Sequence, residues 1–161
     1  MNLIKILKNT LLVIAACLVL SACASTKKVE TTSQMQGDVY TGTDTVEYLA
    51  SGVPDRVFFA TNESILTTAS RDTLRKQANW LRKNPDITVV LEGHADERGT
   101  REYNLALGER RANAAKDYLM TYGDAANRIS EISYGKERPV DSGSNPMARS
   151  KNRRSVTVKA N

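Results

Sequence analysis

The chain has 161 residues, enough for one ordinary domain with a short leader or spacer. Hydrophobic residues make up 40% of it and charged residues 25%, a balance that excludes a disordered chain, a collagen-like fibre and a membrane protein with several spans. Two cysteines and one histidine exclude a disulfide-stapled miniprotein, a four-cysteine zinc module and a histidine-rich metal site. The net charge of +5 suits an anionic partner, either a nucleic acid or an anionic surface.

The N-terminus has the pattern of an export signal. Lys5 and Lys8 precede an uncharged apolar run over residues 11–20. This run is shorter than the roughly 20 residues that a membrane-spanning helix needs, but it has the length of the apolar region of a signal peptide. Residues 1–22 are therefore predicted to be a signal peptide. Their removal takes away two lysines and no acidic residue, which lowers the net charge from +5 to +3.

The end of the apolar run resembles the lipobox of bacterial lipoproteins. It reads Leu20-Ser21-Ala22-Cys23, an aliphatic residue and two small residues before a cysteine. The resemblance implies cleavage before Cys23, a diacylglyceryl group on its thiol and an acyl chain such as palmitate on its new amino group. Several acyl chains anchor a protein stably where one does not. The next residue, Ala24, is not the aspartate of inner-membrane retention, which favours the outer membrane. An ordinary secretory signal with an incidental cysteine is the alternative.

A spacer and a folded domain are expected next. Residues 24–50 are rich in Ser, Thr, Gly and Gln and show little apolar periodicity, the composition of a flexible chain. Residues 23–50, lipidated at Cys23, are predicted to be a tether that could reach on the order of 90 Å when extended. Residues 51–161 are predicted to be the domain. It contains no cysteine, so its stability must come from packing without a disulfide.

Apolar periodicity in the domain predicts four strands and two long helices. Thr67 and Thr100 are of the residue type preferred at helix N-caps, and the helices are expected to end near Asn84-Pro85 and Gly123. A further helical turn is expected at 147–151. The resulting β-α-β-α-β-β order predicts an α+β domain, an α/β sandwich in which helices pack on a mixed sheet. The strands are expected at 56–59, 87–92, 129–134 and 155–159.

The loop at residues 93–99, which reads GHADERG, holds the chemistry for ligand binding. It lies between a buried strand and a helix N-terminus, where open sheets often bind ligands and where the helix dipole favours an ionised Asp96. Asn104, Gly108 and Arg111 fall on one face of the following helix. A mid-helix glycine is unfavourable by about 1 kcal/mol, so Gly108 indicates close approach of a ligand or of another backbone. A carboxylate and a guanidinium beside an open groove suit a zwitterion.

The same side chains also fit roles that involve no zwitterion. Asp96 with Arg98 or Arg111 could form a surface ion pair, which contributes roughly 0–1 kcal/mol to stability. His94 and Asp96 could be metal ligands or, with a serine, a hydrolase triad; the lone histidine and the lack of a nucleophile-elbow motif argue against both. The basic stretch 149–154 would suit nucleic acid in a cytosolic protein, but export makes lipid phosphates or cell-wall acids the available anions.

Longer sequence motifs distinguish between these alternative functions. Residues 55–160 contain GHADERGTREYNLALGERRANAA, SYGKERP and SKNRRSV, which resemble the OmpA-like peptidoglycan-binding domain family. Within it they are most similar to the peptidoglycan-associated lipoproteins, whose lipobox and spacer this chain also has. The fold of the family is a mixed sheet with helices packed on it. Its members bind meso-diaminopimelate of the peptide stem of peptidoglycan without covalent chemistry, so the resemblance implies a binding protein and not an enzyme.

The resemblance also implies a set of ligand contacts. Asp96 would bind the ammonium group of diaminopimelate, Arg111 would bind its carboxylate, and Asn104 would hydrogen-bond the stem. Many members have an acidic residue in the first-strand loop, where this chain has Asn62. That loop would add contacts from Thr61 and Asn62, and two arginines are expected close to the pocket: Arg153 and Arg154.

The implied protein is an outer-membrane lipoprotein with its domain in the periplasm. It would need no cofactor apart from the lipid on Cys23 and would bind no nucleic acid. Its partners would be peptidoglycan, a TolB-like propeller protein and other Tol components of the envelope and division machinery. The alternative is an envelope assembly lipoprotein that has the same fold but does not bind the wall.

Overall fold

The computed structural model describes residues 35–123 and 126–160. The predicted signal peptide, the lipobox and Cys23 lie outside the described residues. The described residues belong to one compact unit that spans Ser33–Asn161. Within this part of the chain, no helix combines the length and the apolar character that crossing a membrane requires.

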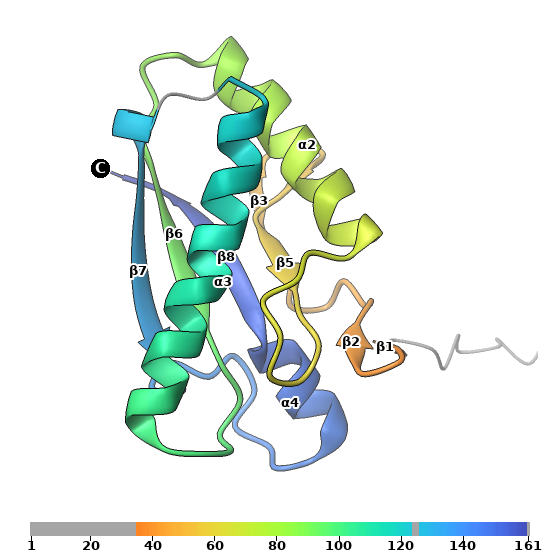
Figure 1. Cartoon of the computed structure of the whole chain (residues 1–161). Coiled ribbons are helices and arrows are strands. Elements are labelled where there is room, and N and C mark those ends of the chain that lie inside the picture. The colour runs from red at the N-terminus through yellow and green to blue at the C-terminus, as the bar shows by residue number, and fades with distance from the viewer. Residues whose placement is uncertain (1–34, 124–125, 161) are drawn as a thin grey trace, which may run out of the picture. The chain divides into compact units, whose positions relative to one another are not determined.

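A four-stranded mixed sheet forms the centre of this unit (Figure 1). β6 and β7 are parallel, and β8 runs antiparallel to both β5 and β6. β6 is therefore an inner strand, and its carboxyl end leads directly into the predicted binding loop. In the spatial order β5-β8-β6-β7, the strands are β5 (Arg56–Phe58), β8 (Arg154–Lys159), β6 (Val89–His94) and β7 (Ile129–Gly135).

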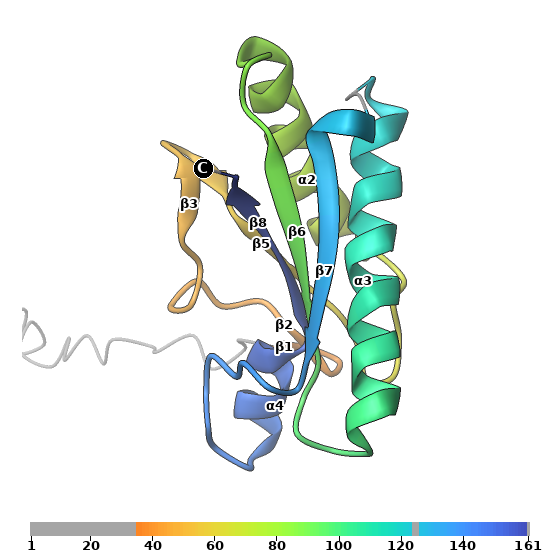
Figure 2. The ribbon, with the colours of Figure 1, turned by 90° about the vertical axis from the view of Figure 1, so that its left-hand side faces the viewer.

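Two long helices cover one face of the sheet (Figure 2). α2 (Thr68–Lys83) and α3 (Arg101–Thr121) begin after the N-caps Thr67 and Thr100, whose side chains each accept a hydrogen bond from the backbone N–H three residues later. A 3-10 turn, η1 (Ala126–Arg128), precedes β7. The short helix α4 (Pro146–Asn152) lies at the end of the sheet where β6 and β7 finish.

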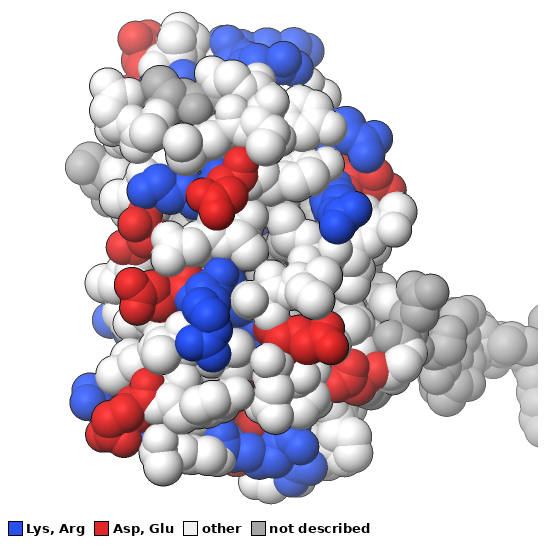
Figure 3. Space-filling model, viewed as in Figure 1, with Lys and Arg blue, Asp and Glu red and all other residues white. Residues whose placement is uncertain are grey.

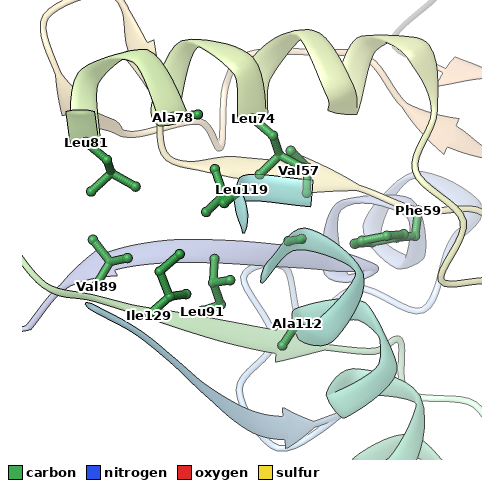
Figure 4. Close-up of a cluster of buried hydrophobic side chains, with 11 residues drawn as sticks. Val57, Phe59, Leu74, Ala78, Leu81, Val89, Leu91, Ala112, Leu119 and Ile129 are labelled. Atoms are coloured by element: carbon green, nitrogen blue, oxygen red, sulfur yellow. The ribbon is translucent and has the colours of Figure 1, made fainter. Parts of the chain in front are cut away.

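Apolar side chains from both layers meet in one core (Figure 4). The helical contributions recur three or four residues apart on α2 and α3, which gives each helix one apolar stripe toward the sheet. β6 contributes alternate residues, as a half-buried strand does. The core consists of Val57, Phe59, Leu74, Ala78, Leu81, Val89, Leu91, Ala112, Ala115, Leu119 and Ile129.

Gly93 on β6 and Gly108 on α3 bring the backbones of strand and helix together. A side chain at Gly93 would place its Cβ 1.8 Å from the carbonyl oxygen of Gly108, and one at Gly108 would place its Cβ 2.3 Å from the Ser133 hydroxyl. Close backbone approach is thus confirmed as the reason for a mid-helix glycine. The predicted ligand groove at Gly108 is wrong, because β6 and β7 fill that space.

Two short hairpins precede the sheet. β1 (Met35–Gln36) pairs with β2 (Val39–Tyr40), and β3 (Tyr48–Ala50) pairs with β4 (Val53–Pro54). Tyr40 is 2% exposed, and its ring packs against that of Phe58 with 4.8 Å between ring centres. The tether predicted over residues 23–50 is therefore too long, since the chain belongs to the folded unit from β1 onward. The buried apolar residues of this segment, Tyr40 and Leu49, are too widely spaced to produce the periodic pattern of a helix or strand.

The other predicted elements agree with the structure within two residues at each boundary, the helical turn that became α4 included. Gly123, predicted to end the second helix, follows the C-cap of α3 and has φ 88°. The predicted α+β class, with helices on a mixed sheet, is confirmed.

Candidate ligand-binding site at the end of strand β6

Asp96 lies in the loop between β6 and α3, and it is buried although it carries a charge. The residue is 7% exposed. Its carboxylate accepts hydrogen bonds from the Arg98 side chain, Nε at 3.1 Å and Nη2 at 2.8 Å, and from the Arg98 backbone N–H at 3.1 Å. Nη1 of Arg153 donates to the same carboxylate at 3.2 Å. Two guanidinium groups thus compensate one buried negative charge.

The pKa of Asp96 reflects this balance. Burial by itself raises the pKa, but hydrogen bonds from Arg98 and Arg153 outweigh burial and hold the pKa of the carboxyl below its ordinary value. Asp96 is therefore ionised at neutral pH. Of its two partners, the Arg98 side chain is 47% exposed and the Arg153 side chain 3%. Arg98 is thus the partner of Asp96 that solvent reaches, whereas Arg153 is part of the interior.

Arg111 is completely buried, whereas a residue that contacts a ligand is expected to be partly exposed. It is 0% exposed, and its guanidinium donates to three backbone carbonyls: Nε to Glu63 at 2.9 Å, Nη1 to His94 at 2.8 Å and Nη2 to Ala60 at 3.0 Å. Burial, and then repulsion from Arg153, lowers its pKa to about 10, so the group stays charged. Arg111 here ties the loop after β5 to the end of β6. Its contact with a ligand carboxylate stays a prediction.

Asn104, in the first turn of α3, supports the binding loop. Its Nδ2 donates to the carbonyls of Arg98 at 2.7 Å and Thr100 at 3.0 Å, and the residue is 2% exposed. The amide thus orients the backbone that carries Asp96. Its hydrogen bond to a peptide stem stays a prediction.

The loop after β5 reaches the same site. The Thr61 hydroxyl accepts a hydrogen bond from Nη2 of Arg98 at 3.3 Å, so Thr61 lies beside the exposed partner of Asp96. Asn62 is exposed and has φ 57°, a left-handed conformation that asparagine adopts more readily than most residues. The structure therefore brings Thr61 to the site and uses Asn62 to shape the turn. Ligand contacts from both stay predictions.

Asp38, between β1 and β2, belongs to this site although the sequence does not suggest it. Its Oδ2 accepts a hydrogen bond from the Thr61 N–H at 2.7 Å and lies 3.7 Å from Nη2 of Arg153, which also donates to the Asp38 carbonyl. No local pattern marks it, because these partners are 23 and 115 residues away.

Arg98 is a second residue of the site whose role the sequence understates. The sequence suggests it only as part of a surface ion pair with Asp96. Its position two residues after Asp96 is the signal that its side chain and its backbone N–H could both bind that carboxylate.

Arg153 and Arg154 end on opposite faces of the sheet. Arg153 contacts Asp96, as described above, so its predicted proximity to the site is confirmed. Arg154 instead lines a pocket with His94 on the face away from the long helices, and the prediction that it lies beside the same site is wrong.

Within residues 35–123 and 126–160, no three His, Cys, Asp or Glu side chains are grouped so that they could hold a metal ion.

Residues 58–153 match the model of the OmpA family. This chain belongs to the OmpA family. The matched region begins in β5 and ends at Arg153, so it contains all of the core residues except Val57, the binding loop, and all the residues around Asp96 described above except Asp38.

Curated relatives of this OmpA-family chain are named peptidoglycan-associated lipoprotein. The one from Mesorhizobium japonicum is 42% identical over 150 residues, which cover 92% of this chain and 89% of the relative. The one from Brucella melitensis is 52% identical over 106 residues, which cover 66% of this chain and 63% of that relative. The latter match thus spans less than two thirds of the Brucella protein. The predicted resemblance to peptidoglycan-associated lipoproteins is confirmed.

Solved structures of related domains share the fold. The crystal structure of the peptidoglycan-associated lipoprotein from Burkholderia pseudomallei aligns with a TM-score of 0.64 at 33% identity, over 66% of this chain and 90% of that chain. The C-terminal domain of Helicobacter pylori MotB aligns with a TM-score of 0.62 at 20% identity, over 66% of this chain and 84% of that chain. The second likeness concerns the fold alone. The predicted OmpA-like architecture is confirmed.

Proposed function

We propose that this OmpA-family chain is a non-enzymatic lipoprotein that binds the peptide stem of peptidoglycan and ties the outer membrane to the cell wall. One observation carries the proposal: Asp96 is buried and ionised, and one of its two counter-ions, Arg98, is exposed. The names of the relatives, which refer to association with peptidoglycan, support it. A stem residue with an ammonium group and a carboxylate, such as meso-diaminopimelate, suits this site better than a neutral sugar does.

In the proposed binding mode, the ligand ammonium replaces the Arg98 guanidinium on Asp96. Arg98 is then free to pair with a carboxylate of the same ligand, because its side chain lies at the surface. Arg153 stays in place and keeps the carboxylate oriented. Arg111 contacts the ligand directly only after the loop that holds Ala60 moves away from it, since the residue is 0% exposed and three of its N–H groups bind backbone carbonyls.

The proposal extends to the envelope. Acyl chains on Cys23 hold the protein on the outer membrane, with the domain in the periplasm. A TolB-like propeller and other Tol components are its protein partners during envelope constriction and division. Two weak attachments on one chain reinforce each other through a high effective concentration, so a modest affinity for the wall suffices.

Binding of the full chain to the cell wall tests this function. The chain, purified in detergent, is sedimented with isolated sacculi and titrated calorimetrically with a diaminopimelate-containing muropeptide. The test variant is Asp96→Asn, which keeps the side-chain shape and removes the charge. Glu97→Gln is the matched control, because it removes the adjacent carboxylate, which pairs with Arg149 instead. Arg111→Ala is less suitable, since it removes the hydrogen bonds that this side chain donates to three backbone carbonyls.

We expect the wild type and Glu97→Gln to bind saturably and Asp96→Asn to bind roughly tenfold or more weakly, because a hydrogen bond to a charged group contributes about 1.5–3 kcal/mol. A thermal melt of each variant separates loss of binding from loss of fold. Equal affinity in all three proteins contradicts the role of Asp96.

An envelope assembly lipoprotein without wall binding is the second candidate. It is favoured because the charged groups of the site already have partners within the protein. Arg111 donates hydrogen bonds to backbone carbonyls, and two arginines pair with Asp96. Absence of heat from folded wild-type protein, at concentrations that detect millimolar affinity, selects this candidate. Soluble fragments released from sacculi by the purified chain would instead reveal an enzyme.

A further inference from the structure

A pocket lies on the face of the sheet away from α2 and α3. Its volume is about 620 Å³, enough for a ligand the size of one or two amino acids. Residues of β3, β5, β6 and β8 and of the segment 138–140 line it. Figure 2 shows the sheet nearly edge-on, with the long helices on one side and β3 on the other. The pocket is therefore separated from the helix layer by the sheet.

Two guanidinium groups in this pocket form no ion pair with a carboxylate among the described residues, although Glu92 and Asp55 attract Arg154 over a longer distance. Arg154 is 6% exposed; its Nη2 donates to the Arg138 carbonyl at 3.2 Å, and its buried Nε has no hydrogen-bond partner in this part of the chain. Arg138 is exposed and stacks on the Tyr134 ring, with its central carbon 3.6 Å from the ring centre. By contrast, basic and acidic side chains are interspersed on the face shown in Figure 3. A buried guanidinium that no carboxylate contacts directly is only partly compensated, and an anion in direct contact would complete the compensation.

His94 adds an unused hydrogen-bonding group to the same pocket. The residue is 1% exposed, and neither ring nitrogen has a hydrogen-bond partner among the described residues. The nearest carboxylate oxygen, on Glu92, is 3.6 Å from Nε2, too far for a hydrogen bond. Burial, and then repulsion from three arginines including Arg154 and Arg138, lowers its pKa to about 3. The ring is therefore neutral at physiological pH and presents one N–H donor.

The charge balance of the pocket favours a monoanion. Four Lys or Arg side chains and three Asp or Glu side chains line it, an excess of one positive charge. Two of these charges neutralise each other, because Asp55 accepts hydrogen bonds from Arg56 at 2.8 and 2.7 Å. Apolar side chains complete the lining, and two of them, Val140 and Val158, are 39% exposed. A single carboxylate on a small apolar group matches both features, whereas a phosphate dianion exceeds the available charge.

We propose that this pocket is a second ligand site, separate from Asp96, that binds a carboxylate carried on a small apolar group, with Arg138 and Arg154 as the cationic clamp and His94 as a further donor. A planar guanidinium can present two parallel N–H groups to the two oxygens of a carboxylate. The unpaired Nε of Arg154 is buried, so a ligand reaches it only after a local shift of the side chain, but no hydrogen bond of Nε has to break. The site is independent of the proposed wall binding, which uses the other side of β6.

The test monitors the NMR signal of His94, which is unambiguous because His94 is the only histidine of the chain. The full chain, labelled with ¹³C-histidine and held in detergent micelles, is titrated with N-acetylalanine, acetate or inorganic phosphate at constant ionic strength, and the imidazole signal of His94 is recorded. We expect a saturable shift with N-acetylalanine and a weaker one with acetate. Arg138→Gln should reduce the affinity roughly tenfold, because it removes one charged partner at an exposed position where folding is not at risk. Arg154→Lys should also weaken binding, since it keeps the charge and removes the planar fork.

Two controls separate this site from other effects. Arg75→Gln makes the same change in net charge on α2, where Arg75 pairs with Asp72, and should leave the titration unchanged. Asp96→Asn should also leave it unchanged, whatever its effect on wall binding. The proposal is overturned if His94 shows no saturable shift, if Arg138→Gln binds like the wild type, or if Asp96→Asn abolishes binding. Tighter binding of phosphate than of N-acetylalanine overturns the assignment to a carboxylate.

Discussion

Arg153 and Arg154 are neighbours in the chain, are almost equally buried at 3% and 6% exposure, and yet lie in opposite electrostatic settings. Arg153 bonds the Asp96 carboxylate and the Phe59 carbonyl, the latter at 3.1 Å, so it connects the binding loop with the segment after β5. Arg154 has only carbonyl acceptors and an unused Nε. Burial alone therefore does not distinguish a structural arginine from one that awaits a ligand; the partners do.

Strand geometry produces this difference. Arg153 is the C-cap of α4 and Arg154 is the first residue of β8, where side chains begin to alternate between the two faces of the sheet. Thr157 on β8 donates from its hydroxyl to Gln77 of α2 at 2.7 Å and thus belongs to the helix side. Arg154 and Val158 line the pocket on the other side. One residue pair consequently serves two surfaces, and the comparison can be tested by removing each charge in turn.

The largest effect is expected for Arg153→Met. The substitution keeps much of the apolar volume but leaves a buried carboxylate with one cation instead of two, and it removes the donor of the Phe59 carbonyl. We expect the free energy of unfolding to fall by about 3 kcal/mol, the range for breaking a buried ion pair. Urea denaturation measures it. A change below about 0.5 kcal/mol, typical of surface substitutions, would place Arg153 outside the structural network.

A smaller, pH-dependent effect is expected for Asp96→Asn. The pKa of Asp96 is held below its ordinary value of 3.8, so its charge stabilises the folded state above that pH, and this contribution is lost as the pH falls through the folded-state pKa. The variant should be less stable than the wild type by about 1–3 kcal/mol at pH 7, and the difference should narrow in acid. Urea denaturation at several pH values, with Glu97→Gln as control, measures it. A difference that widens below pH 4 contradicts the sign of the shift.

Much of the fold was predictable because its signals are local. Thr67 and Thr100 begin helices, and the apolar spacing on α2 and α3 follows from the helical period. The loop that carries Asp96 was also predictable, since a strand end, a helix start and a long motif coincide there. The ordered hairpin around Tyr40 was not, because its burial depends on contact with Phe58 and not on any pattern of its own.

The environment of the charged side chains was less predictable. Helical spacing places Arg111 beside the binding loop, but it does not reveal that three carbonyls from distant segments occupy the guanidinium. Asp38 joins the site through partners 23 and 115 residues away, which no local motif encodes. The separation of Arg153 from Arg154 depends on where β8 begins, and boundaries are the least certain part of a sequence-based prediction.

The smallest effect on stability, and the sharpest test of the comparison, is expected for Arg154→Met. A methionine removes a buried charge that forms no ion pair. The free energy lost with the hydrogen bonds to the Asn152 and Arg138 carbonyls is offset because a buried charge no longer has to be desolvated. We expect the free energy of unfolding to change by less than about 1 kcal/mol in either direction. N-acetylalanine should stabilise the wild type in urea by linkage and should not stabilise this variant. If Arg154→Met destabilises the protein as much as Arg153→Met does, both arginines are structural and the pocket beside His94 is not a ligand site.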